Sequence, residues 1–259
     1  MDSKFIPYLT ELAAKYSAAE DLKAELEEGA VKITCNKGSF RFFYNFVETP
    51  ERDGFRNIPL YHWTAKRRYV EMRGMLDNKL VEVPVGMRVH HVVSHDGFTC
   101  TLKDIIVFES SLTEFILRQK IDRVFADFSG EAYTNCIMST DGNVKVSMEL
   151  GFIPDGSEPV LLHEVVCKTG IASDVAVDTQ TMQYPIYVFK GKETLVYNNI
   201  DNELYDLDNT QADCIRFILN VLSEPARIDE LEKSYRHIEK IYEAALKSNE
   251  STSYIVLEG

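Results

Sequence analysis

The histidines are the side chains of this sequence best suited to acid–base chemistry. His90 and His91 are adjacent on a predicted strand, so their side chains point to opposite faces of it. His91 and His95 share a face if the strand continues that far. Together with His163 or Glu164 they could act as acid and base groups, because an imidazole changes its charge near neutral pH. We therefore take His91, His95, His163 and Glu164 as the candidate catalytic residues.

These residues also have a simpler interpretation as surface or hydrogen-bonded strand residues. No spacing among them fixes a metal site, so no metal is predicted. Asp104, at a predicted helix start, could orient a substrate hydroxyl, but an N-cap role needs no further assumption. Asp174 falls in a predicted surface loop after Gly170, where solvation explains it.

The glycine-rich and nucleophile motifs of common cofactor enzymes are missing. No GxGxxG follows an opening strand, and neither GxxxxGK[ST] nor GxSxG occurs. The predicted elements also lack the alternating strand and helix order of a parallel dinucleotide-binding sheet. We therefore predict that the chain holds no cofactor and is not a self-sufficient NAD(P)-dependent dehydrogenase.

Net charge, cysteine spacing and the lack of long apolar segments exclude further classes of protein. The 259 residues carry a net charge of −13, which argues against nucleic-acid or anionic-membrane binding. The one basic run, residues 66–68, is interpreted as a solvated helix face. Five scattered cysteines without a CxxC pair are typical of reduced thiols. No signal peptide or membrane span is visible, so we expect a cytoplasmic location.

The spacing of apolar residues predicts a mixture of helices and strands. Alternation is clearest at 143–150, where Val144, Val146, Met148 and Leu150 share one face. The aromatic run Phe40–Phe46 and Trp63 suit either a packed core or a passive sugar-binding platform. The predicted helices are 6–28, 61–78, 104–119, 208–222 and 228–248. The predicted strands are 31–35, 39–47, 81–94, 122–128, 131–140, 143–150, 160–168, 184–190, 194–198 and 254–257.

The order of these elements from Tyr61 to Leu257 resembles the C-terminal domain of the glucose-fructose oxidoreductase and inositol dehydrogenase family (Gfo/Idh/MocA). The resemblance is one of pattern rather than of invariant motif. It is carried by Val85-Gly-Met-Arg-Val-His-His-Val92, Ile121-Asp-Arg-Val-Phe-Ala-Asp127, Asp141-Gly-Asn-Val-Lys-Val-Ser-Met-Glu-Leu150, Phe152-Ile-Pro-Asp-Gly156, Glu164-Val-Val-Cys-Lys-Thr-Gly170, Ala212-Asp-Cys-Ile-Arg216 and the end of the chain from His237.

The resemblance implies an α+β fold with an open, mostly antiparallel sheet and helices packed on one face. It also implies a division into an N-terminal helix and hairpin extension, residues 1–60, and an oxidoreductase-like domain, residues 61–259. Members of the family often form oligomers through the exposed sheet face. We expect no counterpart here of the family's nucleotide-binding domain, because residues 1–60 are too few for it.

A second departure lies in the helix that begins near Leu102. The family commonly carries Leu-x-Asp-x-Gly-x-His-x-x-Asp there, with the histidine and the last aspartate facing the substrate. Aligned on Leu102 and Asp104, this chain has Phe108 and Ser111 at those two positions. A phenyl ring cannot exchange the proton that alcohol oxidation requires.

Two functions from different classes remain. The first is a non-catalytic or accessory relative of sugar and cyclitol oxidoreductases, acting as a homo-oligomer or as the partner subunit of a full-length oxidoreductase. The alternative is a cofactor-independent isomerase or lyase acting on a sugar-like small molecule, with His91, His95, His163 and Glu164 in one pocket.

Overall fold

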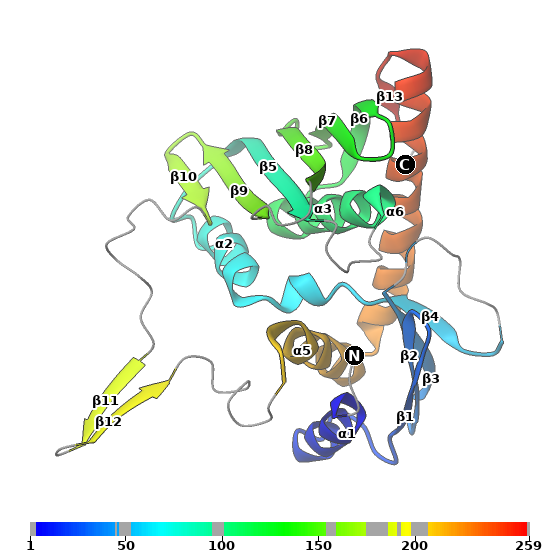
Figure 1. Ribbon diagram of the computed structural model, residues 1–259, viewed down its shortest axis with the longest axis vertical. Coiled ribbons are helices and arrows are strands. Elements are labelled where there is room, and N and C mark those ends of the chain that lie inside the picture. The colour runs from blue at the N-terminus through cyan, green and yellow to red at the C-terminus, as the bar shows by residue number, and fades with distance from the viewer. Residues whose placement is uncertain are drawn as a thin grey trace.

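The protein has an α+β fold built around two open sheets, as the sequence predicts (Figure 1). The computed structural model describes residues 4–44, 46, 53–94, 101–153, 159–174, 186–190, 193–197 and 207–257, with the backbone alone for the two ranges between 186 and 197. None of the described helices combines the length and the apolar character that crossing a bilayer would require.

The larger sheet has seven strands in the order β10-β9-β5-β8-β7-β6-β13. Neighbouring strands are antiparallel except β5 and β8, which run parallel. Val146, Met148 and Leu150 are buried while Lys145 and Glu149 are exposed, so the predicted alternation is confirmed. The strands are β5 (Pro84–Ser94), β6 (Ile121–Ser129), β7 (Tyr133–Thr140), β8 (Lys145–Ile153), β9 (Val160–Cys167), β10 (Gly170–Ser173) and β13 (Ile255–Val256).

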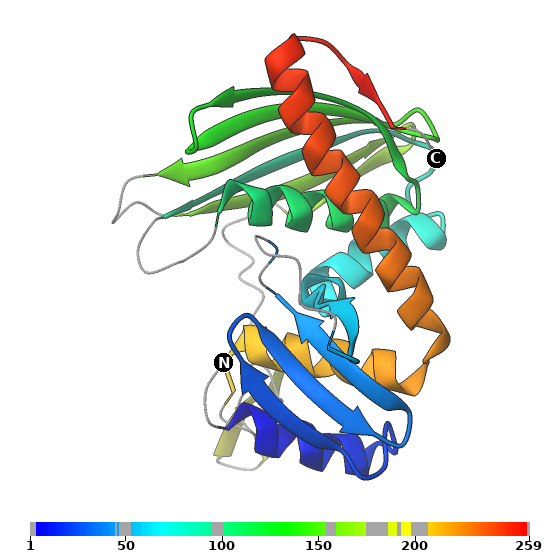
Figure 2. The same ribbon diagram turned by 90° about the vertical axis from the view of Figure 1, so that its right-hand side faces the viewer.

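Helix α3 (Leu102–Leu117) covers one face of this sheet, as both ribbon views show (Figures 1 and 2). It begins with a capping box in which Thr101 and Asp104 each bond the other's backbone N–H. Asp104 is therefore the third helical residue rather than the N-cap. Helix α2 (Arg67–Asp77) and the long helix α6 (Ala226–Ser251) pack beside α3.

The N-terminal part forms a separate four-stranded sheet, with α1 (Phe5–Lys15) and α5 (Asn209–Ser223) nearby (Figure 2). The 3-10 helix η1 (His62–Ala65) joins it to α2. The strands are β1 (Lys23–Glu27), β2 (Ala30–Cys35), β3 (Gly38–Phe43) and β4 (Arg56–Pro59). A further pair, β11 (Ile186–Lys190) and β12 (Glu193–Tyr197), forms a hairpin.

The predicted helix over 6–28 is wrong in its second half. Helix α1 ends at Lys15, and positive φ angles at Ser17 and Asp21 turn the chain out of the helix. Residues Lys23–Glu27 then pair with β2 around Gly29, whose φ of 75° favours glycine. Backbone pairing in the hairpin therefore outweighs the helical spacing of the apolar residues.

The phenylalanines of the run Phe40–Phe46 are core residues, and so is Trp63. Phe40, Phe42, Phe43, Phe46 and Trp63 are all at most 3 % exposed. The alternative of an exposed sugar-binding platform is therefore wrong. The apolar core is one connected cluster that includes residues from Phe5 to Ala245, and the division at residue 60 stays a prediction.

Candidate functional site

A buried glutamate that sequence reasoning missed lies at the centre of the candidate site. Glu109 is on the sheet-facing side of α3 and is fully buried. Its Oε1 lies 2.6 Å from Nδ1 of His91 on β5, and its Oε2 lies 3.0 Å from Nε2 of His163 on β9. Glu109 falls three or four residues from Ile105, Ile106 and Leu112 along the helix. The sequence could have revealed Glu109, because a carboxylate among the apolar residues of one helix face is unusual.

Asp174 extends this cluster on the far side of His163. Its Oδ2 lies 2.8 Å from Nδ1 of His163, and its Oδ1 accepts the His163 backbone N–H at 2.6 Å. The Arg68 guanidinium lies 3.9 Å from the same carboxylate. The predicted solvated loop position is therefore wrong for Asp174, whose side chain is 4 % exposed. Backbone pairing of β10 with β9 brings this residue back to His163.

The chain Asp174–His163–Glu109–His91 is an alternation of carboxylates and imidazoles. Burial alone would lower the pKa of His163, but Glu109 and Asp174 raise it to about 9. Burial alone would raise the pKa of Glu109, yet the charge and hydrogen bond of His163, together with the bond from His91, lower it. The opposite charges of His163 and Glu109 thus stabilise each other in a buried site.

Of the four predicted site residues, the structure brings two together. His91 and His163 both bond Glu109, and His90 points to the other face, as predicted. Glu164 also lies on the other face, 3.5 Å from Arg88, because residues 163 and 164 alternate along β9. The prediction of Glu164 in a shared site with His163 is therefore wrong. His95 lies outside the described residues.

Aromatic side chains enclose the two imidazoles. The Phe108 ring lies 5.2 Å from the His91 ring and 4.4 Å from the Trp63 ring, centroid to centroid. Trp63 donates its indole N–H to the Ser111 hydroxyl at 3.0 Å, and that hydroxyl donates to the Phe108 carbonyl at 2.9 Å. Tyr69 packs edge-on against His163 at 5.0 Å. The two helix positions aligned with the family's histidine and aspartate are therefore occupied by packed, hydrogen-bonded side chains.

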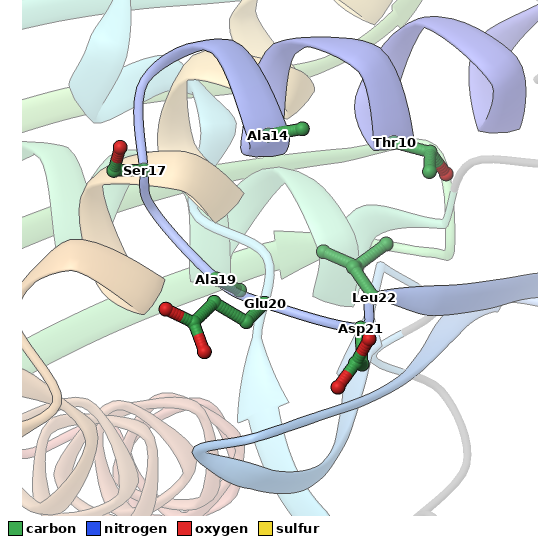
Figure 3. A pocket seen from close by; sticks show the side chains of 7 residues that line it. All are labelled: Thr10, Ala14, Ser17, Ala19, Glu20, Asp21 and Leu22. Carbon is green, nitrogen blue, oxygen red and sulfur yellow. The ribbon is translucent and has the colours of Figure 1, made fainter.

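The described residues of this cluster offer no metal centre, and the hollow that the structure describes lies elsewhere. Among the described residues, no three His, Cys, Asp or Glu side chains are arranged to hold a metal ion. A hollow of about 460 Å³ lies instead between the end of α1 and the start of β1, lined among others by Thr10, Glu20 and Leu22 (Figure 3). In Figure 1 this region lies at the opposite end of the molecule from the seven-stranded sheet.

Solved structures of cyclitol dehydrogenases share this fold. A protein from Sinorhizobium meliloti 1021 assigned as a myo-inositol dehydrogenase matches with a TM-score of 0.56 and 12% identity, over 79% of this chain and 66% of that one. Scyllo-inositol dehydrogenase from Lactobacillus casei, solved with NAD(H) and scyllo-inositol, matches with a TM-score of 0.54 and 9% identity, over 78% and 65%. Myo-inositol 2-dehydrogenase from Lactobacillus plantarum matches with a TM-score of 0.53 and 10% identity, over 79% of this chain and 65% of that one.

These matches define the class of fold to which the chain is similar, that of the Gfo/Idh/MocA inositol dehydrogenases. The expected α+β architecture and the resemblance at the level of fold are confirmed. The chain spans just under two thirds of the length of each of these structures. No protein-family model and no curated protein matches the sequence.

Proposed function

We propose that this chain is a relative of the sugar and cyclitol oxidoreductases that does not carry out hydride transfer itself. It acts as an accessory protein, either as a homo-oligomer or as the partner subunit of a full-length oxidoreductase. One observation carries the proposal. Phe108 and Ser111 stand at the helix positions that the resemblance assigns to an acid–base histidine and an aspartate, and both pack against Trp63.

The chemistry of these two side chains supports a non-oxidising role. The phenyl ring of Phe108 has no titratable proton, and the Ser111 hydroxyl is engaged with Trp63 and the Phe108 carbonyl. Oxidising an alcohol to a ketone requires a group that removes the hydroxyl proton as the hydride leaves. Neither residue supplies one.

Calorimetry with NAD(H) and NADP(H) tests this proposal. We expect no binding heat from the pure chain at micromolar concentrations. Micromolar affinity for either nicotinamide cofactor would refute the proposal, since it would place a redox carrier on the chain.

The open face of the seven-stranded sheet is the surface through which association is proposed. Ile137 on β7 is 44 % exposed there, between Phe125 and Ser147 of the adjacent strands. Ile137→Glu should shift the sedimentation velocity profile toward the monomer. Val70→Glu on α2, where the native side chain is similarly exposed, is the matched control and should leave the profile unchanged. A wild-type chain that is monomeric and retains no oxidoreductase in pull-downs would contradict the accessory role.

A specific observation favours a second candidate, a cofactor-independent isomerase or lyase acting on a sugar-like molecule. His91 is hydrogen-bonded to a buried carboxylate, which is the arrangement of a general base and its orienting group. Of the residues predicted for this function, His91 and His163 support it, and Glu164 does not take part.

A further inference from the structure

The hydrogen bonds of the Asp174–His163–Glu109–His91 chain fix where its protons lie. An ionised carboxylate can only accept hydrogen bonds. Both ring nitrogens of His163 face carboxylate oxygens, Nδ1 at 2.8 Å from Asp174 and Nε2 at 3.0 Å from Glu109. Both nitrogens must therefore donate, and His163 is an imidazolium. One buried cation thus lies between two buried anions.

The same reasoning fixes the tautomer of His91. The second oxygen of Glu109 lies 2.6 Å from Nδ1 of His91, so this nitrogen also donates. When the His91 ring is neutral, its single proton is on Nδ1, and Nε2 carries a free lone pair. Glu109 thereby holds the ring with its basic nitrogen directed away from the carboxylate.

His91 is the most exposed member of this hydrogen-bonded series. The side chains of Glu109 and His163 are fully buried, and that of Asp174 is 4 % exposed. The His91 side chain is 12 % exposed. A small molecule can therefore contact this hydrogen-bonded series at His91. The side chains of Glu109, His163 and Asp174 are too deeply buried for such a contact.

We infer that His91 is a catalytic proton-transfer residue, and that Glu109 is the residue that positions it. His163 and Asp174 hold Glu109 ionised and immobile. This inference rests on the second proposed function, and it deepens that function by naming the substrate class. An imidazole removes a proton at a useful rate only from an activated position, so the substrate is a polyhydroxylated carbonyl compound that loses the proton on the carbon beside its carbonyl.

The step is balanced without an oxidant or a reductant. Nε2 of His91 takes the proton, the C–H electron pair forms the carbon–carbon double bond of an enolate, and the carbonyl oxygen takes the negative charge. Return of a proton from the same nitrogen to the carbon regenerates the carbonyl. In heavy water the returned proton is a deuteron, because the partly exposed His91 imidazole exchanges its proton with solvent.

The protonation pattern is tested by nitrogen NMR of uniformly ¹⁵N-labelled protein at pH 7. We expect two protonated nitrogens on His163 and a proton on Nδ1 of His91. Glu109→Gln should release His91 into a mixture of tautomers, whereas Glu149→Gln, an exposed glutamate 3.9 Å from His90, should leave His91 unchanged. A bare nitrogen on His163, or His91 protonated on Nε2 alone, would overturn the inference.

The chemistry is tested with 2-keto-myo-inositol in heavy water, with deuterium incorporation beside the carbonyl followed by proton NMR. His91→Gln should lower the exchange rate by roughly 10²–10⁴-fold, the usual contribution of a general base. His90→Gln, the neighbour on the opposite face, should keep the wild-type rate. A wild-type chain with the expected tautomers but no exchange would refute the proton-transfer function alone. Exchange that survives His91→Gln would refute the role of His91.

Discussion

Replacing His163 with glutamine should remove a pH dependence of stability that the native protein shows between pH 6.5 and 9. The folded-state pKa of His163 is about 9, against an ordinary value of 6.5. Because the folded pKa is the higher one, the group stabilises the fold fully below pH 6.5, and this stabilisation is lost as the pH rises toward 9. Each pH unit is worth about 1.4 kcal/mol, so the loss amounts to about 3 kcal/mol.

Urea denaturation at a series of pH values from 6 to 9.5 measures this effect. The free energy of unfolding of the wild type should fall across the range, and that of His163→Gln should stay nearly level. The variant is itself less stable by about 3–5 kcal/mol at pH 6.5, since two buried carboxylates lose their cation. Asp174→Asn keeps the imidazole but removes one of the two anions that raise its pKa, so the decline should be smaller and should end at a lower pH.

His90→Gln is the control for this series, because its imidazole is on the opposite face of the neighbouring strand β5, 3.9 Å from Glu149. It should show the wild-type decline. Wild-type stability that does not change between pH 6.5 and 9 would refute the assignment of a buried imidazolium. So would an equally steep decline in His163→Gln.

Two further substitutions test contacts that hold the helices in place. Ser248→Ala should lower the free energy of unfolding in urea by about 1–3 kcal/mol, because the buried Ser248 hydroxyl accepts the Ala126 N–H of strand β6 at 3.0 Å. Ser251→Ala, at an exposed position of the same helix, should have little effect, and equal losses in the two variants would argue against this role. Trp63→Phe should lower the free energy of unfolding by about 1–2 kcal/mol, because it removes the donor of the hydrogen bond to Ser111. In a double-mutant cycle this loss should be coupled to that of Ser111→Ala. Additive losses would mean that the hydrogen bond contributes nothing to stability.

Local periodicity was enough to predict most of the larger sheet and its helices. The strands near 122–128, 131–140, 143–150 and 160–168 are all found, because an alternation of apolar residues records which face of a strand is buried. It failed at residues 16–28, where Leu22 and Leu26 fit helical spacing but the chain forms a hairpin. Pairing with β2 is a tertiary effect, and no local pattern reports it.

The candidate site was only half predictable for a related reason. His91 and His163 were chosen as histidines on predicted strands, yet their meeting depends on β9 pairing with β5 and on α3 covering that face. Asp174 was assigned to solvent because it fell in a predicted surface loop after Gly170. Its burial follows from the return of β10 along β9, which the spacing of residues does not encode.

The positions of Phe108 and Glu109 on α3 explain how an imidazole site can exist without a histidine on that helix. Phe108 lies beside His91 with 5.2 Å between ring centroids, and the next residue, Glu109, bonds Nδ1 of the same ring. The phenyl ring keeps water from one side of the imidazole, and the carboxylate fixes its orientation. A histidine at position 108 would place a second imidazole against His91 without an aspartate at 111 to orient it. Phe108→His alone therefore should not produce a dehydrogenase site. The carboxylate of Glu109, which could orient a new imidazole, is already hydrogen-bonded to His91 of β5.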